Sequence, residues 1–452
     1  MALDRMGPSA PLIFHPTDSA HPLVVSQSST AVRVFSEPGA RVQLSRDSVV
    51  LASASALAGL RKTRVFDRPQ SMALASSADL VAKTSFDGLS ILHVQPLLDG
   101  SATPATLYKL PGVGMGGIPV WSPDASQLLV QGAGGTVHLV QVADGSVSDP
   151  GLDGSVRMLD WHPDGKRWLG MTNGGGELVE VPMGAGASRT VARASRWFSN
   201  FAIAPDGQHV AAVDGGQLVL LSLPDGHVLA QSQPGADDYE PLQWSSDGQS
   251  VYFLARQGDA QAYQVHLQQV GQAAPVVVTA HEEGVDHFSL SPTDVLAFVR
   301  GTQLHIVDAA GAAPRSIDMG IHPESMAWAR SGLLFVTDSD GVTSLALPGT
   351  ALFPPIALRA GRNLLVAQAT DLEGNAGAQS AAISVTYDAQ ASALPDFSVQ
   401  GADVTILPQI PRAGEASRVT VVVNNVGIAD APGARVRMPV SYTHLTLPTI
   451  LL

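Results

Sequence analysis

The sequence predicts an all-β protein whose main body is a seven-bladed β-propeller. Three observations carry this prediction: a turn-rich composition, a phrase that recurs about every forty residues, and strand-like segments between its copies. The chain has 452 residues, of which 45% are hydrophobic and only 15% charged, with 44 glycines and 31 prolines. This composition suits short strands joined by tight turns. A repeat of about forty residues is typical of propellers with four strands per blade.

The recurring phrase consists of an apolar lead residue, a small polar residue, often Pro, and then Asp-Gly or a variant of it. It is clearest at Trp161–Gly165 and Trp244–Gly248. The successive lead residues are Leu74, Trp121, Trp161, Ile203, Trp244, Leu290 and Trp328. Because Pro fixes φ and Asp-Gly supplies a positive-φ position, each phrase encodes a hairpin turn. We expect each lead residue on an inner strand, packed between neighbouring blades, and each Asp-Gly pair in a structural turn.

The residues between two phrases supply the other strands of a blade. In the second blade, Gln127–Val130 and Thr136–Val142 are predicted strands separated by the turn Gly132–Gly135. Ahead of the first phrase, Arg64–Asp67 matches Arg315–Asp318, which precedes the last phrase as an outer strand. The earlier segment has no blade of its own, so we expect it to complete the seventh blade. Such closure leaves no exposed sheet edge.

The Trp-Ser-Pro-Asp-Gly form of the phrase resembles the repeats of TolB-like propellers more than Trp-Asp repeats. The resemblance covers residues 61–347, and it implies that this range is the propeller domain. The first, sixth and seventh copies depart most from the pattern. Fold resemblance alone does not choose a function, because propellers host many unrelated ones.

The segments on either side of the propeller resemble the two halves of a bacterial immunoglobulin-like domain. Glu37–Val42 has the Glu-Pro-Gly-Ala-x-Val motif that comes early in that family. Gly361–Asn375 contains the Gly-x-Asn, Ala-Thr-Asp and Gly-Asn motifs of its second half. The resemblance implies one β-sandwich formed by residues 11–58 and 349–389, with the propeller inserted in it. Two unrelated partial domains are the alternative.

The C-terminal part resembles a third unit. Asn425–Gly433 has the Asn-x-Gly-x-Ala-Asp-Ala-Pro-Gly pattern of CARDB domains, which are bacterial adhesion-type β-sandwiches, and residues 394–438 would form a truncated copy. Residues 439–452 look like a translated sequencing adapter, so we expect a non-native tail and neighbouring domains in a longer natural protein. These resemblances imply an exported bacterial protein, located outside the cell, on its surface or in the periplasm.

Composition and missing motifs narrow the functional classes. The net charge of −14 and the lack of a basic stripe argue against nucleic-acid binding. With no cysteine, the sequence can form neither disulfides nor a cysteine-ligated zinc site. It contains no long apolar span that predicts a membrane crossing. We find no Gly-x-Ser-x-Gly, His-Glu-x-x-His or phosphate-loop motif, so an enzyme is the less favoured expectation.

Polar and aromatic residues gather in the segments that enter the inner strands of blades four to seven. Such loops meet at one mouth of a propeller, so we expect a ligand site there. The candidate ligand-binding residues are Trp197, Phe198, Asn200, Asp237, Asp238, Tyr239, Glu240, His281, Glu282, Asp286, His287 and His322. Asp238 and Asp286 are the candidate metal ligands, with Ca²⁺ as the possible ion. The alternative is a set of ordinary solvated loop residues.

The favoured function is a non-enzymatic binding, adhesion or scaffold module of a large exported protein, with a protein or glycan ligand at the propeller loops. Aromatic residues in those loops suit stacking on a sugar or a peptide. Two alternatives remain open: a propeller-type enzyme acting on polysaccharide, as a lyase or hydrolase, and a TolB-like periplasmic assembly protein.

Overall fold

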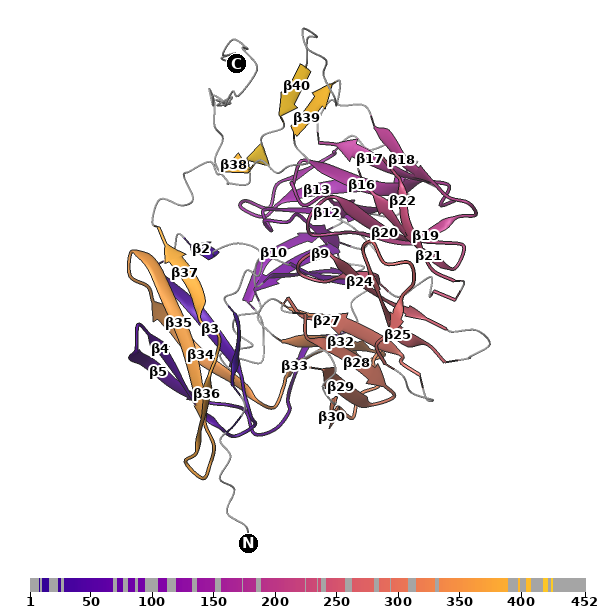
Figure 1. Ribbon diagram of the computed structural model, residues 1–452. Coiled ribbons are helices and arrows are strands. Elements are labelled where there is room, and N and C mark those ends of the chain that lie inside the picture. The colour runs from indigo at the N-terminus through magenta and orange to yellow at the C-terminus, as the bar shows by residue number, and fades with distance from the viewer. Residues whose placement is uncertain are drawn as a thin grey trace, which may run out of the picture. The chain divides into compact units, whose positions relative to one another are not determined.

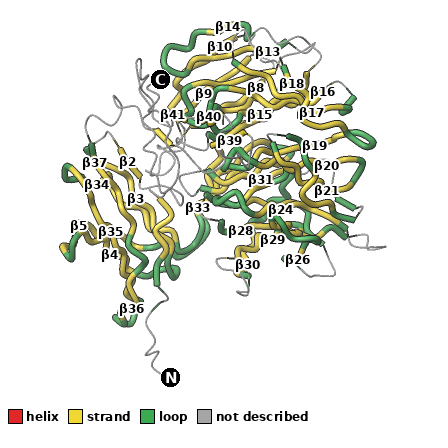
Figure 2. Tube along the Cα trace, turned by 45° about the horizontal axis from the view of Figure 1, so that its top comes forward, coloured by secondary structure: helices red, strands yellow, loops and turns green. Residues whose placement is uncertain are grey.

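The computed structural model of the chain is all-β. It describes residues 8–388 apart from short gaps, of which the longest are 16–22, 94–104, 112–118 and 308–313, and four short strands beyond residue 388. The described residues form strands, turns and loops (Figures 1 and 2). None of them lies in a helix with the length and apolar character that crossing a membrane requires.

Within the described residues, seven four-stranded antiparallel sheets form the blades of a propeller (Figure 1). Blade one comprises β7 (Ser71–Leu74), β8 (Leu80–Ser85), β9 (Gly88–His93) and β10 (Ala105–Pro111). Blade two comprises β11 (Pro119–Trp121), β12 (Gln127–Gln131), β13 (Val137–Gln141) and β14 (Val147–Ser148). Blade three comprises β15 (Val156–Trp161), β16 (Arg167–Thr172), β17 (Glu177–Pro182) and β18 (Arg189–Arg193).

The remaining blades repeat this order from the inner to the outer strand. Blade four comprises β19 (Phe198–Ile203), β20 (His209–Asp214), β21 (Gln217–Ser222) and β22 (Val228–Gln231). Blade five comprises β23 (Gln243–Trp244), β24 (Ser250–Ala255), β25 (Gln264–Gln269) and β26 (Val276–Val277). Blade six comprises β27 (His287–Leu290), β28 (Leu296–Arg300), β29 (Gln303–Val307) and β30 (Arg315–Asp318). Blade seven comprises β31 (Ser325–Trp328), β32 (Leu334–Asp338), β33 (Gly341–Ala346) and β6 (Arg61–Asp67).

Blade seven is completed by the strand that precedes blade one in the sequence. β6 pairs antiparallel with β33, from Asp67 opposite Gly341 to Arg61 opposite Ala346. Phe66 is buried in an apolar core shared with Phe335 of blade seven and residues of blade one. The predicted closure by a borrowed strand is therefore confirmed.

The aspartates of the recurring phrase act in the turns. Ser122 Oγ donates to Asp124 Oδ1 at 2.7 Å, and the same oxygen accepts the Ser126 N–H at 3.0 Å. In blade five, Ser245 Oγ donates to Asp247 in the same way. The next residue has a positive φ in four blades, namely at Ala125, Gly165, Gly207 and Gly248. This geometry confirms the expected turn role of the phrase.

Tryptophan lead residues join the inner strands of neighbouring blades. The indole N–H of Trp121 donates to the Ala73 carbonyl at 3.0 Å, and that of Trp161 donates to the Val120 carbonyl at 3.1 Å. The indole of Trp244 reaches Ala202 of blade four in the same way. Each acceptor is the residue just before the lead residue of the preceding blade, so this contact recurs at three junctions. Trp328 of blade seven is the exception, because its indole N–H is buried without a hydrogen-bond partner among the described residues.

At other junctions, a polar side chain makes the contact between inner strands. Asp160 Oδ2 accepts the Ile203 N–H at 3.5 Å, between blades three and four. Gln243 accepts the Leu290 N–H at 2.7 Å, and its amide donates to a carbonyl of the same inner strand in blade six. The two residues hold the same position in their blades. Ser289, also just before a lead residue, accepts the Trp328 N–H of blade seven at 3.2 Å.

Strands from before and after the propeller in the sequence pair with each other. One sheet has the order β1 (Leu12–His15), β3 (Ser29–Phe35), β34 (Thr350–Ala357). The other has the order β2 (Leu23–Val25), β37 (Ile383–Tyr387), β35 (Gly361–Thr370), β4 (Arg41–Arg46), β5 (Val49–Ser55), with β36 (Ala376–Gln379) paired to β35. Arg46 is buried and donates to Asn363 Oδ1 at 3.1 Å across 317 residues of sequence.

The proposed domain boundaries remain a prediction. Beyond residue 388, β38 (Phe397–Ser398) pairs with β41 (Asn424–Asn425), and β39 (Val404–Leu407) pairs with β40 (Arg418–Val421). The rest of the CARDB-like segment 394–438 and the whole tail 439–452 lie outside the described residues.

Candidate functional site

The predicted ligand site lies in the loops that enter the inner strands, and the structure describes half of its residues. Those described are Trp197, Phe198, Asn200, Asp286, His287 and His322. Asp237, Asp238, Tyr239, Glu240, His281 and Glu282 lie outside the described residues. The site as a whole therefore stays a prediction.

The loop before blade four presents one aromatic side chain to solvent. Trp197 is 47% exposed, whereas Phe198 is 3% and Asn200 is 9% exposed. Both buried residues belong to β19, and Phe198 packs in the core between blades three and four. A ligand at this mouth would meet Trp197 directly, and it would reach the other two only after a rearrangement.

Asp214 holds this loop in place. Its carboxylate accepts the backbone N–H groups of Ser195, Arg196 and Trp197 at 2.6, 2.9 and 3.2 Å. Burial alone would raise the pKa of Asp214, but these hydrogen bonds lower it below its ordinary value. The negative charge of Asp214 therefore has a structural role in holding this loop.

The blade-six and blade-seven candidates are polar groups near the same ends of their inner strands. Asp286 is exposed, and its Oδ2 accepts the Gly301 N–H at 2.7 Å, which ties it to a turn of its own blade. His287 is half-buried and His322 is exposed. Among the described residues, no three histidine or acidic side chains are grouped as a metal site. Because Asp238 is not described, the predicted cation site remains a prediction.

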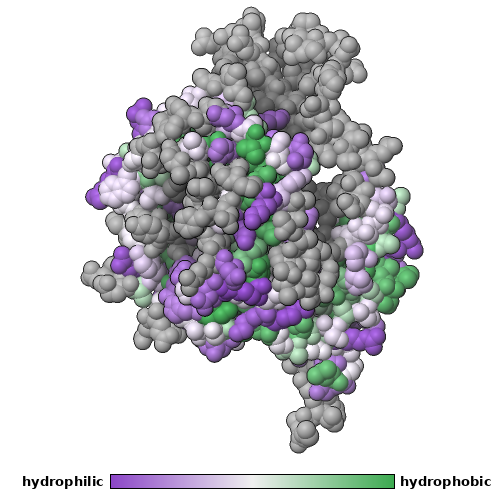
Figure 3. All heavy atoms as spheres, turned by 180° about the vertical axis from the view of Figure 1, so that it is seen from behind, coloured by the Kyte–Doolittle hydropathy of each residue, from purple (hydrophilic) through white to green (hydrophobic). Residues whose placement is uncertain are grey.

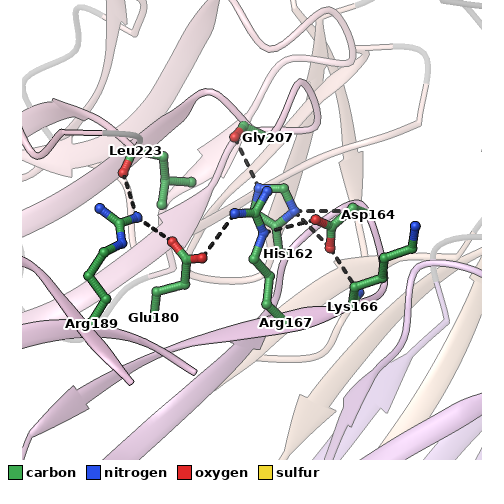
Figure 4. A network of polar contacts seen from close by, with 8 residues as sticks. All are labelled: His162, Asp164, Lys166, Arg167, Glu180, Arg189, Gly207 and Leu223. Atoms are coloured by element: carbon green, nitrogen blue, oxygen red, sulfur yellow. Dashed lines mark hydrogen bonds and ion pairs between the residues drawn. The ribbon is translucent and has the colours of Figure 1, made fainter. Parts of the chain in front are cut away.

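An ion network links the outer parts of blades three and four (Figure 4). Arg167 lies between Asp164 and Glu180, at 2.8 and 2.9 Å, and Arg189 pairs with the other oxygen of Glu180. Arg189 also donates to the Leu223 carbonyl of blade four. Burial would raise the pKa of Glu180, but its two arginine partners lower it. Each charge has a partner, so the network is a structural clamp.

His162 belongs to the same clamp. Its Nε2 donates to the Gly207 carbonyl of blade four at 3.1 Å, and its Nδ1 accepts the Asp164 N–H at 3.2 Å. Burial opposes ionisation of Asp164, but contacts with His162, the Lys166 N–H and Arg167 lower the pKa of its carboxyl to about 2. Both ring nitrogens of His162 are hydrogen-bonded and only 6% of the residue is exposed. His162 therefore has a structural role, in which it joins the turn at Asp164 to the turn at Gly207.

Asp160 is the one described carboxyl whose pKa is strongly raised. Burial raises the pKa of Asp160 to about 6, against the opposing effect of the hydrogen bonds from the Ile203 and Trp161 N–H groups. Raised carboxyl pKa values occur at catalytic sites and also in buried structural contacts. Here the carboxylate bridges two inner strands, so the structural role accounts for it.

We expect Asp160→Asn to stabilise the protein at neutral pH by about 1–2 kcal/mol. Ionising this half-buried group opposes folding, and a shift from 3.8 to about 6 corresponds to about 3 kcal/mol at most. The native carboxyl contributes stability that is complete below pH 4 and is lost as the pH rises through 6. Chemical denaturation from pH 4.5 to 7.5 should therefore show the advantage of the variant growing with pH, and a constant difference would contradict the assignment.

A cavity of about 410 Å³ lies at the other end of the inner strands, where the turns of the recurring phrase begin. Its wall includes the lead residues of five blades, which are Leu74, Ile203, Trp244, Leu290 and Trp328. All five are half-buried, whereas Trp121 and Trp161 of blades two and three are only 8% and 4% exposed. Because several inner strands converge on this cavity, we call it the axial cavity. The expectation that lead residues serve only to pack blades together is therefore incomplete.

One charged residue is found among the described residues that line the axial cavity. Asp294 takes the positive-φ position of the blade-six turn, with φ of 62°, where blades two to five have Ala or Gly. Its carboxylate accepts both the N–H and the Oγ–H of Ser246 in blade five, each at 2.7 Å. The aspartates of the turns in blades two to five cap their own turn, so Asp294 differs from them in reaching across a blade junction. The sequence shows that this Asp is unusual, because it follows its lead residue by four positions, whereas the Asp of blades two to five follows by three.

Comparison with solved structures finds a similar propeller. The chain is similar to the β-propeller domain of Cps50 (Swd1) from Myceliophteria thermophila, with a TM-score of 0.48 and 12% sequence identity. The match covers 63% of this chain and 97% of that one. The seven-bladed assignment itself rests on the strand pairing described above.

No family model matches the chain, and no curated protein does. The resemblances to TolB-like repeats, to immunoglobulin-like domains and to CARDB domains therefore rest on their motifs alone.

Proposed function

We propose that this chain is a non-enzymatic binding or scaffold module whose propeller holds its ligand in the axial cavity. The cavity carries the proposal: it is concave, its wall is mainly apolar, and only a few polar groups line it. Its volume falls in the range of about 300–1,000 Å³ that is typical of ligand pockets. The hydrogen bonds between inner strands provide a rigid frame around it, which lowers the entropy lost on binding.

Apolar side chains elsewhere on the propeller surface are dispersed. Those of Val147, Val228 and Val276 are exposed, but they lie on the outer strands of three different blades. The face seen in Figure 3 carries broad hydrophilic tracts with smaller apolar areas between them. Single exposed apolar residues are ordinary, so the axial cavity remains the better candidate for binding.

The proposal also covers the location of the protein and its neighbouring domains. The motifs of the flanking segments support an exported bacterial protein with an adhesion role, in which further β-domains act as spacers. A protein or a glycan would be the partner, and the loops around Trp197 and His322 would offer a second contact surface at the opposite ends of the inner strands.

We expect Ala202→Phe to weaken ligand binding by partly filling the axial cavity. Ala202 lines the cavity and is half-buried, but it also packs against the apolar core of blades four and five, so the melting temperature of the variant is measured beside its binding. The measurement is a peptide and glycan array probed with the whole chain, followed by titration of each hit. Hits should bind the variant at least about tenfold more weakly.

Val228→Phe is the matched control, because Val228 is 59% exposed on an outer strand and does not line the cavity. It should leave both binding and the melting temperature unchanged. Hits that bind the native chain and Ala202→Phe equally well would place the ligand outside the cavity. A chain without hits on either array would contradict the binding role.

A further inference from the structure

We infer that the axial cavity receives a cationic side chain, Lys or Arg, of a partner polypeptide. The inference rests on the proposed function and specifies the chemistry of the same site. Among the described residues that line the cavity, Asp294 is the one charged residue and none is basic. The chain as a whole carries a net charge of −14. Both the local and the overall charge therefore favour a cation over an anion.

Ser246 holds the Asp294 carboxylate in place, and this carboxylate can still accept further hydrogen bonds. Ser246 donates one hydrogen bond to each of its two oxygens. An ionised carboxylate offers about four lone-pair sites, so about two remain for a ligand. Asp294 is exposed, and a neutral ligand that covered it would remove water without replacing those hydrogen bonds. An ammonium or guanidinium group would replace them with charge-assisted bonds.

The aromatic and aliphatic wall suits the rest of such a side chain. Trp244 and Trp328 both line the cavity and are half-buried, and indole faces attract cations. The His209 ring stacks against Trp244 with centroids 6.3 Å apart, which leaves one indole face for a ligand. Leu74, Ile203 and Leu290 provide apolar surface for the methylene stem of Lys or Arg, which normally packs on such surface while its charged end stays polar. A short acidic or wholly polar side chain would use neither feature.

The rim of the cavity suits a polypeptide. Pro205 and Pro292 line the cavity and are both exposed, and each presents an apolar ring without an N–H group. Residues on either side of an inserted Lys or Arg can pack against these rings. A free amine would gain nothing from them, so a peptide should bind more tightly than the amine alone.

The test uses four labelled peptide pools with random flanks and a fixed central residue: Lys, Arg, norleucine or Glu. Fluorescence anisotropy with the whole chain should show binding of the Lys and Arg pools, about tenfold weaker binding of the norleucine pool, and none of the Glu pool. Affinity for the Lys pool should fall with rising salt, because an exposed charge pair is screened. n-Butylamine is the small-amine arm, and it should compete only at much higher concentration than the peptide.

Asp294→Asn should weaken binding of the Lys pool about tenfold and leave the norleucine pool unchanged. Asn tolerates a positive φ, and its carbonyl can still accept from Ser246. Asp294→Gly is the second variant, because Gly holds the same turn position in blades three to five. The matched control is Asp247→Asn, which changes an exposed turn aspartate that does not line the cavity.

Equal binding of the Lys and norleucine pools, or an unchanged Lys pool in both Asp294 variants, would overturn the cationic ligand. Competition by n-butylamine at the concentration of the peptide would overturn the polypeptide. A lack of binding by all four pools would overturn the inference as a whole. In each case the Ala202→Phe result decides the proposed function separately, because neutral peptides or glycans displaced by that variant would leave the binding role standing.

Discussion

Trp161→Ala should lower the free energy of unfolding by about 3–5 kcal/mol. The Trp161 side chain lies between blades two and three, is 4% exposed, and meets Trp168 edge to face with ring centroids 5.6 Å apart. The substitution leaves a large cavity and also deprives the Val120 carbonyl of its indole donor. Urea denaturation followed by circular dichroism measures the loss without depending on tryptophan fluorescence.

Trp197→Ala is the matched control for this prediction. It removes the same side chain from a site that is 47% exposed, where little packing is lost. We expect a change within about 1 kcal/mol. A similar loss in the two variants would contradict the view that Trp161 is part of a tightly packed blade junction.

Gly175→Ala should destabilise the protein by about 2–4 kcal/mol. Gly175 has a φ of 71°, and a Cβ added there would lie 2.2 Å from the Phe198 carbonyl oxygen of the next blade. The backbones approach closely because the Phe198 N–H donates to the Gly175 carbonyl at 2.6 Å. The added methyl group must push this hydrogen-bonded pair apart, so thermal and urea denaturation should both show the loss.

The adjacent Gly174 separates the two causes. It also has a positive φ, 88°, but an added Cβ would have no atom within 4 Å. Gly174→Ala should therefore cost only the strain of the backbone conformation, about 1 kcal/mol. If both variants lost the same amount, the close approach of blades three and four at Gly175 would not matter for stability.

The fold could be predicted because its signals are local and repeated. Each turn is encoded by four or five adjacent residues, and seven copies at a regular spacing indicate a ring of blades. The borrowed strand was predictable because Arg64–Asp67 repeats the pattern of Arg315–Asp318. Register and turn chemistry are short-range properties, and sequence patterns report them well.

The candidate site was harder to predict because it depends on how the blades meet. The exposure of a lead residue is set by the packing of several inner strands, so Trp161 and Trp244 look alike in sequence yet differ in burial. Phe198 was taken as a loop residue, although it starts β19 and points into the core. The contact between Asp294 and Ser246 joins residues 48 positions apart, and the shifted position of Asp294 in its phrase does not identify Ser246 as the partner.

The pairing of β6 with β33 has a consequence for biosynthesis. β6 emerges from the ribosome early, but its partner strand is translated only after the six intervening blades. During that time its backbone groups must be satisfied by water or by a chaperone, and the seventh sheet cannot form. Contacts between residues so distant in sequence slow folding. A ribosome stalled before residue 341 would therefore hold a nascent chain in which β6, the first strand of the propeller, remains open to proteolysis.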